Sequence, residues 1–130
     1  MARDLLSDVT LSAMGKVLDA TAARQRAIAH NIANVDTPGY TRSDVSFHDQ
    51  LARALEDAGD DPLLAASRVG EIRPRSALDA QTPSRADGNN VDVDREMASL
   101  AGNTLEYEAA AEIVKVKLDM LRSAVSEGRK

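Results

Sequence analysis

The chain of 130 residues contains no cysteine and no tryptophan, and its aromatic side chains are two tyrosines and one phenylalanine. Without cysteine it can form neither a disulfide framework nor a cysteine-based metal site. Aromatic side chains supply much of the buried area of compact cores. A chain that is 43% apolar but only 2% aromatic depends on Ala, Leu, Val, Ile and Met, which favours helices packed side by side.

Long apolar runs are also missing. No stretch approaches the roughly 20 apolar residues that a membrane-spanning helix needs. The first residues include Asp4 and Asp8 and have no apolar core, so we do not interpret them as a secretory signal peptide. Any export is expected to use another route. The formal net charge of −5 argues against a nucleic-acid partner, because such binding needs clustered lysine and arginine.

Apolar residues recur every three or four positions in the first and last thirds of the chain. This heptad spacing keeps one stripe of a helix against a partner helix. The predicted seam contains Met14, Leu18, Ile28, Ile32, Val93, Met97, Leu100, Tyr107, Val114, Leu118, Leu121 and Val125. The polar Thr21 and Gln25 also occupy seam positions, where polar side chains can fix the register of two helices at some loss of stability.

Each predicted helix has a second apolar stripe beside the seam. The larger members of these stripes are Val17, Leu105, Ile113, Val116 and Met120. Two explanations fit the pattern. Either the stripes reflect generous amphipathicity, with alanines present for helix propensity alone, or they face other copies of the protein. The pattern leaves both explanations open, and the five residues are our candidate subunit contacts.

The sequence divides into four segments. Residues 1–35 are predicted to form the first helix, and residues 36–55 a turn motif followed by a short extended run. Residues 56–91 are rich in charge, proline and glycine, and we expect them to be irregular or disordered. Residues 92–130 are predicted to form the last helix, with Asp92 as its N-cap. The expected fold is all-α, with two long terminal helices joined by a long irregular middle segment.

A chain reversal is predicted directly after the first helix. Pro38 disfavours helical geometry at Thr37, so the helix should end near Asn34. In the sequence Thr37-Pro38-Gly39-Tyr40, proline and glycine occupy the second and third turn positions, as a type II turn prefers. A short extended run should follow at 44–47.

These residues resemble a known family. The segment from Asn31 to Tyr40 resembles the signature shared by flagellar axial proteins of the rod, hook and hook-junction group. Arg42 and Phe47 after the turn, and the stretch 87–97 before the last helix, are similar to the proximal rod members of that group. The resemblance extends over both helical ends of the chain.

The resemblance implies an architecture and a set of partners. The terminal helices would pair as an antiparallel coiled coil in a hollow helical rod, which transmits torque and passes later subunits through its lumen. The implied neighbours are other copies of the chain, other rod proteins, the adaptor that joins the rod to the membrane ring, and that ring. Also implied is export through the flagellar type III apparatus, without a cleaved signal peptide, to the periplasmic rod of the basal body.

No catalytic, cofactor or metal site is predicted. His30 and His48, the two histidines, show no recognised ligand spacing. Asp94 and Glu96 fit the first turn of a helix, where the helix dipole favours negative charge. Nucleophile elbows, phosphate loops and catalytic triads are absent from the sequence. We therefore expect a structural protein, not an enzyme, with no small-molecule substrate.

One alternative comes from a different class of protein. A soluble helical-hairpin adaptor, or a secretion chaperone, would bind a client helix in an apolar groove. The second apolar stripes suit that role equally well. The turn signature distinguishes the two hypotheses, because a groove-binding hairpin has no need of it.

Overall fold

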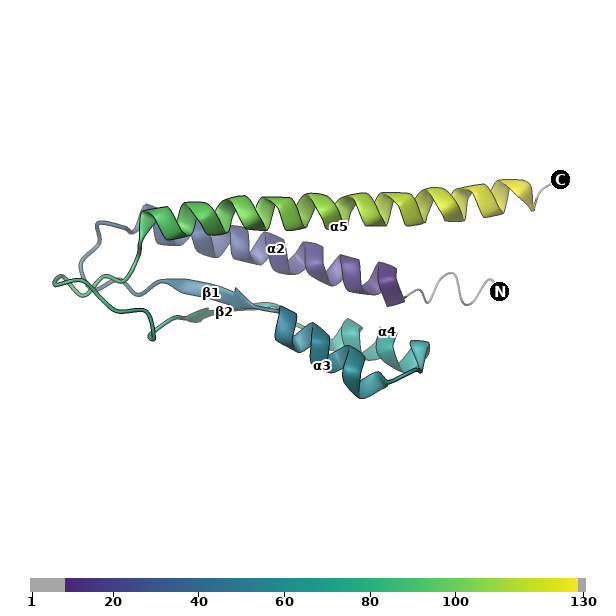
Figure 1. The fold of residues 1–130 in the computed structure, drawn as a ribbon, viewed down its shortest axis with the longest axis horizontal. Coiled ribbons are helices and arrows are strands. Elements are labelled where there is room, and N and C mark those ends of the chain that lie inside the picture. Colours follow the sequence, from purple (N-terminus) through teal and green to yellow (C-terminus); the bar gives the residue numbers. More distant parts are fainter. Residues whose placement is uncertain (1–8, 129–130) are drawn as a thin grey trace.

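The computed structural model describes residues 9–128, so the first and last residues of the predicted terminal helices lie outside the described range. Along the chain the elements are α2 (Val9–Ala33), β1 (Ser43–Ser46), α3 (His48–Ala58), α4 (Pro62–Glu71), β2 (Arg75–Leu78) and α5 (Val93–Glu127). Figure 1 shows α2 and α5 side by side and running in opposite directions, with the α3–α4 hairpin below α2.

The ends of the long helices agree with the sequence. α2 ends at Ala33, next to the predicted stop. The side chain of Asp92 accepts hydrogen bonds from the backbone N–H groups of Asp94 (3.0 Å) and Arg95 (3.3 Å), so the predicted N-cap is confirmed. Two long helices that pack together are therefore confirmed, whereas their pairing as a regular coiled coil remains a prediction.

The prediction of an irregular middle segment was wrong for residues 56–78, whereas residues 79–91 contain neither helix nor strand. α4 and β2 both lie within residues 56–91. α4 begins at an N-cap, Asp61, whose carboxylate accepts from the N–H groups of Leu63 (2.9 Å) and Leu64 (3.1 Å), with Pro62 at the first helical position. An aspartate followed by proline is a strong helix start, because it satisfies free N–H groups and presets φ. That signal was present in the sequence.

The fold also contains a small sheet, so the chain is predominantly helical rather than all-α. β1 and β2 pair antiparallel, with Ser43 opposite Leu78 and Ser46 opposite Arg75. β1 overlaps the extended run expected at 44–47 and begins and ends one residue earlier. The sheet brings the run after the turn and residues 75–78 of the middle segment together beside α2.

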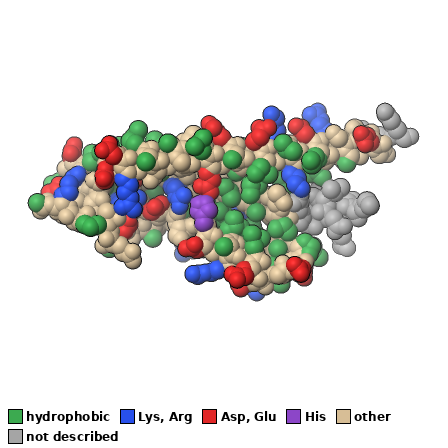
Figure 2. Space-filling model, in the orientation of Figure 1, with side chains coloured by type: hydrophobic (Ala, Val, Ile, Leu, Met, Phe, Trp, Pro, Cys, Tyr) green, Lys and Arg blue, Asp and Glu red, His purple; other side chains and the backbone are tan. Residues whose placement is uncertain are grey.

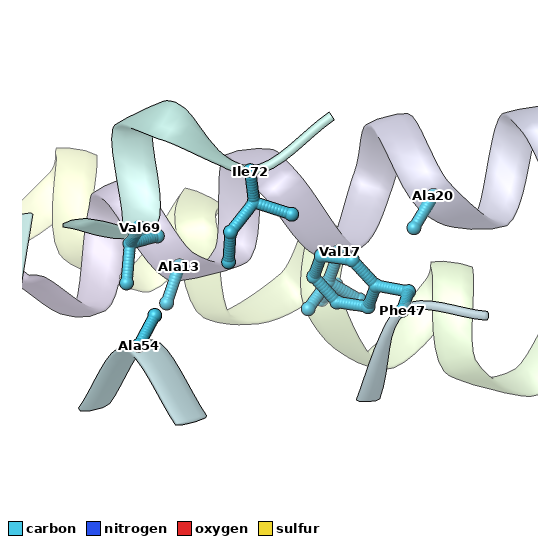
Figure 3. Packing of buried hydrophobic residues seen from close by; sticks show 8 residues of the cluster. Ala13, Val17, Ala20, Phe47, Ala54, Val69 and Ile72 are labelled. Atoms are coloured by element: carbon cyan, nitrogen blue, oxygen red, sulfur yellow. The ribbon is translucent and has the colours of Figure 1, made fainter. Parts of the chain in front are cut away.

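The apolar core lies between α2 and the α3–α4 hairpin. Figure 3 shows Val17 and Ala13 of α2 directed toward Phe47, Ala54 and Val69. Val17 is 7% exposed. It therefore packs inside the subunit and not at the predicted subunit contact, because the unforeseen hairpin covers the second stripe of α2. Among the helices of residues 9–128, none combines the length and apolar character needed to cross a membrane.

Candidate functional site

The two signature segments of the sequence meet at one end of the helix pair. Asn89 is fully buried, and its side-chain amide donates hydrogen bonds to the carbonyls of Asn34 (2.9 Å), Val35 (3.1 Å) and Thr37 (2.8 Å). The backbone N–H of Gly39 donates to the carbonyl of Asp87 at 2.8 Å. The turn after α2 is thus closed by the loop that precedes α5. We call this region, formed by residues 31–47 and 79–96, the polar junction.

Two glycines allow this close approach. The N–H of Tyr40 donates to the carbonyl of Thr37 at 3.2 Å, and Gly39 has φ 73°, as expected for the predicted type II turn. Gly88 has φ 82°, and a Cβ there would lie 3.3 Å from the Cα of Gly39. Positive φ and tight spacing both favour glycine at position 88.

A buried ion pair lies at the centre of the polar junction. Glu96 is 0% exposed and Arg42 is 2% exposed. Arg42 Nε donates to Glu96 Oε1 at 2.7 Å, and Asn31 Nδ2 donates to Glu96 Oε2 at 3.0 Å. Both carboxylate oxygens of Glu96 therefore have partners, which is the condition for burying a charge. This arrangement connects α2, the segment after the turn, and the first turn of α5.

Arg42 holds a second carboxylate at the edge of the junction. Its Nη1 donates to Asp79 Oδ2 at 2.6 Å, and its backbone N–H donates to Asn90 Oδ1 at 2.6 Å. Burial lowers the pKa of Arg42, but hydrogen bonds to Glu96 and Asp79 outweigh that effect and raise it. The Thr82 hydroxyl, together with the Arg42 guanidinium, holds the pKa of the Asp79 carboxyl well below its usual range.

Polar side chains of α2 also satisfy the outer edge of β1. Asn31 Oδ1 accepts from the N–H of Ser43 (2.9 Å), and Asn31 Nδ2 donates to the carbonyl of the same residue (2.8 Å). Arg24 Nη2 donates to the carbonyl of Val45 at 2.7 Å. An edge strand with unpaired backbone groups invites other strands, and here α2 covers that edge.

The axial-motif residues have different surroundings. Asn31 is fully buried, Asn34 and Tyr40 are half-buried, and Thr37, Pro38 and Gly39 are exposed. The Tyr40 hydroxyl donates to Asn31 Oδ1 at 3.3 Å. The buried residue of the motif, Asn31, therefore stabilises the chain reversal, while the turn residues Thr37, Pro38 and Gly39 are exposed to solvent.

The contact between α5 and α2 does not follow the predicted seam. The fully buried side chains of α5 are Glu96, Asn103 and Ala110, at intervals of seven residues. Of the predicted seam, Ile28 is buried, Met14, Leu18, Ile32, Leu100, Val114 and Leu121 are half-buried, and Val93, Met97, Tyr107, Leu118 and Val125 are exposed. The contact face of α5 therefore combines Leu100, Val114 and Leu121 of the predicted seam with Glu96, Asn103 and Ala110, which lie one position before Met97, Thr104 and Ala111.

The four candidate subunit contacts on α5 face away from α2. Leu105 and Met120 are 67% and 61% exposed, and Ile113 and Val116 are also exposed. We call these four residues the outer flank. Figure 2 shows apolar side chains distributed along α5 on the face in view. Large exposed apolar patches are typical of interaction sites, so these four residues remain candidates for a subunit contact.

The arrangement offers binding surfaces but no catalytic constellation. Within residues 9–128, no group of three or more His, Cys, Asp or Glu residues is placed to hold a metal ion. His48 Nε2 lies 2.6 Å from Glu106 Oε1, which joins the start of α3 to α5. That contact is on the surface and connects two helices, so its evident role is structural.

Comparisons with known proteins agree with this picture. A family profile described as "Flagella basal body rod protein" matches residues 17–41. The chain is 35% identical to the flagellar basal body rod protein FlgB of Borreliella burgdorferi, over 71% of this chain and 77% of that relative. It is 32% identical to the FlgB protein of Bacillus subtilis, over 92% of this chain and 95% of the relative. Identity to the Escherichia coli FlgB protein is 28%, over 93% and 96% of the two chains.

These matches extend over nearly the whole chain and include both segments that form the polar junction. The chain therefore belongs to the FlgB family of flagellar basal body rod proteins, which makes it a structural subunit of the rod and not an enzyme.

Proposed function

We propose that this subunit builds the proximal part of a hollow helical rod through head-to-tail contacts made by the exposed faces of α5. The observation that carries the proposal is the outer flank, whose four large apolar side chains have no covering element in the described subunit. Contacts between different faces of identical subunits do not close, and so they generate filaments. A stiff tube of this kind transmits torque and passes later subunits through its lumen.

The same helix has further exposed apolar residues on the side of the predicted seam. Met97 and Leu118 are each 51% exposed, and Val125 is 69% exposed. Apolar side chains on both sides of the α2 contact allow α5 to meet more than one neighbour. An antiparallel coiled coil that is completed by neighbouring subunits is consistent with this distribution.

The proposed neighbours include more than identical copies. They are other rod proteins, the adaptor that joins the rod to the membrane ring, and that ring. The subunit would reach the periplasm through the flagellar type III export apparatus without a cleaved signal peptide. Neither nucleic acid nor a small molecule is a proposed partner. These proposals rest on family membership and on the exposed faces of α5.

Charge placed on the outer flank tests the proposal. Ile113→Asp and Met120→Asp should each leave the free energy of unfolding of the monomer within about 0.5 kcal/mol of the parent, because both side chains are already exposed. Burying the new carboxylate against a neighbour without a partner is unfavourable. A strain that lacks the gene and is complemented with either variant should show basal-body rings without a rod by electron microscopy.

Glu108→Lys supplies a matched control, because it reverses a charge at an exposed position of the same helix between the two apolar sides. The control should support rods and filaments. Leu118→Asp should behave like the outer-flank variants if the second apolar side also meets a neighbour. Normal rods from both Ile113→Asp and Met120→Asp would show that the outer flank is not a subunit contact.

A further inference from the structure

One buried amide of α5 is only partly satisfied. Asn103 is 4% exposed, and its Nδ2 donates to the carbonyl of Thr21 (2.9 Å) and to Gln25 Oε1 (3.2 Å) of α2. Within the described part of the chain, Asn103 Oδ1 has no hydrogen-bond partner. A buried acceptor without a partner is unfavourable, so an apolar side chain at this position would give a more stable helix pair. The role of the asparagine must therefore lie elsewhere than in stability.

Apolar burial alone does not determine how α5 is oriented against α2. Successive residues of an α-helix are about 100° apart around its axis. Viewed along the axis of α5, the centre of the predicted seam lies roughly 60° from Asn103 in one direction. The centre of the outer flank lies roughly 120° from Asn103 in the other direction. A rotation of α5 by about 60° would turn Tyr107 and Leu118 toward α2. That rotated arrangement would bury more apolar surface than the observed one, which has Glu96, Asn103 and Ala110 at its centre.

We infer that Asn103 determines which face of α5 meets α2 beyond the first turn, which Glu96 holds. Glu96 fixes the first turn of α5 through Arg42 and Asn31. Two helical turns later, Asn103 forms the next polar contact with α2, on the same face. A rotation that buried the seam would break both amide bonds of Asn103 while its apolar neighbours gained area. A buried polar side chain that specifies one packing at a loss of stability is known from coiled coils.

The face of α5 that packs against α2 also determines which apolar residues remain exposed for assembly. This step rests on the proposed function. With Asn103 against α2, the exposed seam residues and the outer flank remain on the surface of the subunit, on opposite sides of the helix pair. A rotated α5 would bury the seam residues within the subunit and remove them from contact with neighbours. Asn103 therefore keeps apolar surface available that intramolecular packing would otherwise cover.

Spin labels can measure the rotation directly. The chain contains no cysteine, so the labels attach only at the two cysteines that are introduced. The full chain would be labelled at Asp19→Cys of α2, paired with either Glu108→Cys or Ala109→Cys of α5. These two α5 positions lie on opposite sides of the α2 contact. In Asn103→Leu, the distance from 19 to 108 should shorten and that from 19 to 109 should lengthen, each by up to about 5 Å, given the radius of a helix with its side chains.

Two further variants separate face selection from general damage. Asn103→Ala removes the amide without adding bulk and should shift or broaden the same two distance distributions. Asn103→Gln retains an amide and should reproduce the parent distances. Circular dichroism checks that each variant is folded, and Asn103→Leu should unfold at an equal or higher denaturant concentration than the parent.

The possible results are decisive. Opposite shifts of the two distances in Asn103→Leu and Asn103→Ala, with parent distances in Asn103→Gln, support the inference. Folded Asn103→Leu and Asn103→Ala proteins with unchanged distances would overturn it, because α5 would then keep its face without the amide. These measurements use isolated subunits, so they are independent of whether the outer flank contacts a neighbour in the rod.

Discussion

The two halves of α5 contact their surroundings through opposite chemistry. In the first half, the inward-facing positions Glu96 and Asn103 are polar, and both form hydrogen bonds with α2. In the second half, Ile113, Val116 and Met120 are apolar and exposed. The inward-facing polar side chains of the first half have their partners within the chain, whereas these apolar side chains of the second half, like Met97 and Leu105 in the first, present surface that the subunit does not cover. Polar contacts thus position the first half of α5 on α2, and the exposed apolar side chains of α5 remain for assembly.

The strongest test of this comparison removes the charged partner at the polar junction. Arg42→Ala leaves Glu96 buried without its cation, and breaking a buried ion pair in this way costs about 3–5 kcal/mol. The free energy of unfolding, measured by urea denaturation of the monomer, should fall by that amount. The outer-flank substitutions change the second half of the helix and should leave the same quantity almost unchanged.

Arg53→Ala is the matched control, because Arg53 is exposed on α3 and surface substitutions usually change stability by less than about 0.5 kcal/mol. A loss below about 1 kcal/mol for Arg42→Ala would mean that water or a rearranged side chain replaces the guanidinium. In that case the polar junction would not be what fixes the fold.

The next test removes the amide that closes the turn. Asn89→Ala removes the donor shared by the carbonyls of Asn34, Val35 and Thr37, each of which keeps one other donor. It also leaves the buried N–H of Val91 without its acceptor at 2.7 Å. Unsatisfied buried groups cost about 1–3 kcal/mol. We expect a destabilisation in that range, with faster amide hydrogen exchange confined to residues 34–40 and 87–91.

Gln81→Ala in the same loop is a suitable comparison, because Gln81 is exposed and its backbone makes the contact to Asp79. It should leave both the stability and the exchange pattern at parent values. Equal exchange rates in Asn89→Ala and the parent would show that the turn holds its shape without the loop before α5.

Local signals in the sequence predicted several parts of this structure correctly. The end of α2, the type II turn and the Asp92 N-cap each depend on a few adjacent residues, whose conformational preferences act locally. The start of α4 at Asp61 and Pro62 is equally local. It could have been predicted, but the many prolines and glycines around it favoured an irregular segment.

The polar junction could not be predicted, because its partners are far apart in the sequence. Glu96 and Arg42 are 54 residues apart, and a glutamate in the first turn of a helix has a sufficient explanation in the helix dipole. The same limit explains the position of Val17. The sequence makes Val17 a candidate subunit contact because nothing in it predicts that the α3–α4 hairpin covers this stripe.

The smallest expected effect is a dependence of stability on pH at the edge of the polar junction. Asp79 accepts hydrogen bonds from the Thr82 hydroxyl (2.8 Å) and from Arg42 (2.6 Å), which lower its pKa in the folded chain. In the unfolded chain an aspartate has a pKa of about 3.9. Because the folded pKa is the lower one, the contribution of Asp79 is complete above about pH 4 and is lost as the pH falls further.

Asp79→Asn should therefore be less stable than the parent at pH 7, and its free energy of unfolding should fall less steeply between about pH 4 and pH 2. Thr82→Ala should lie between the two, because it removes the largest cause of the lowered pKa and keeps Arg42. Urea denaturation across this pH range measures all three proteins. If Asp79→Asn and the parent lost stability with the same slope, the acid sensitivity would come from other carboxylates, and the contact between Arg42 and Asp79 would contribute little to stability.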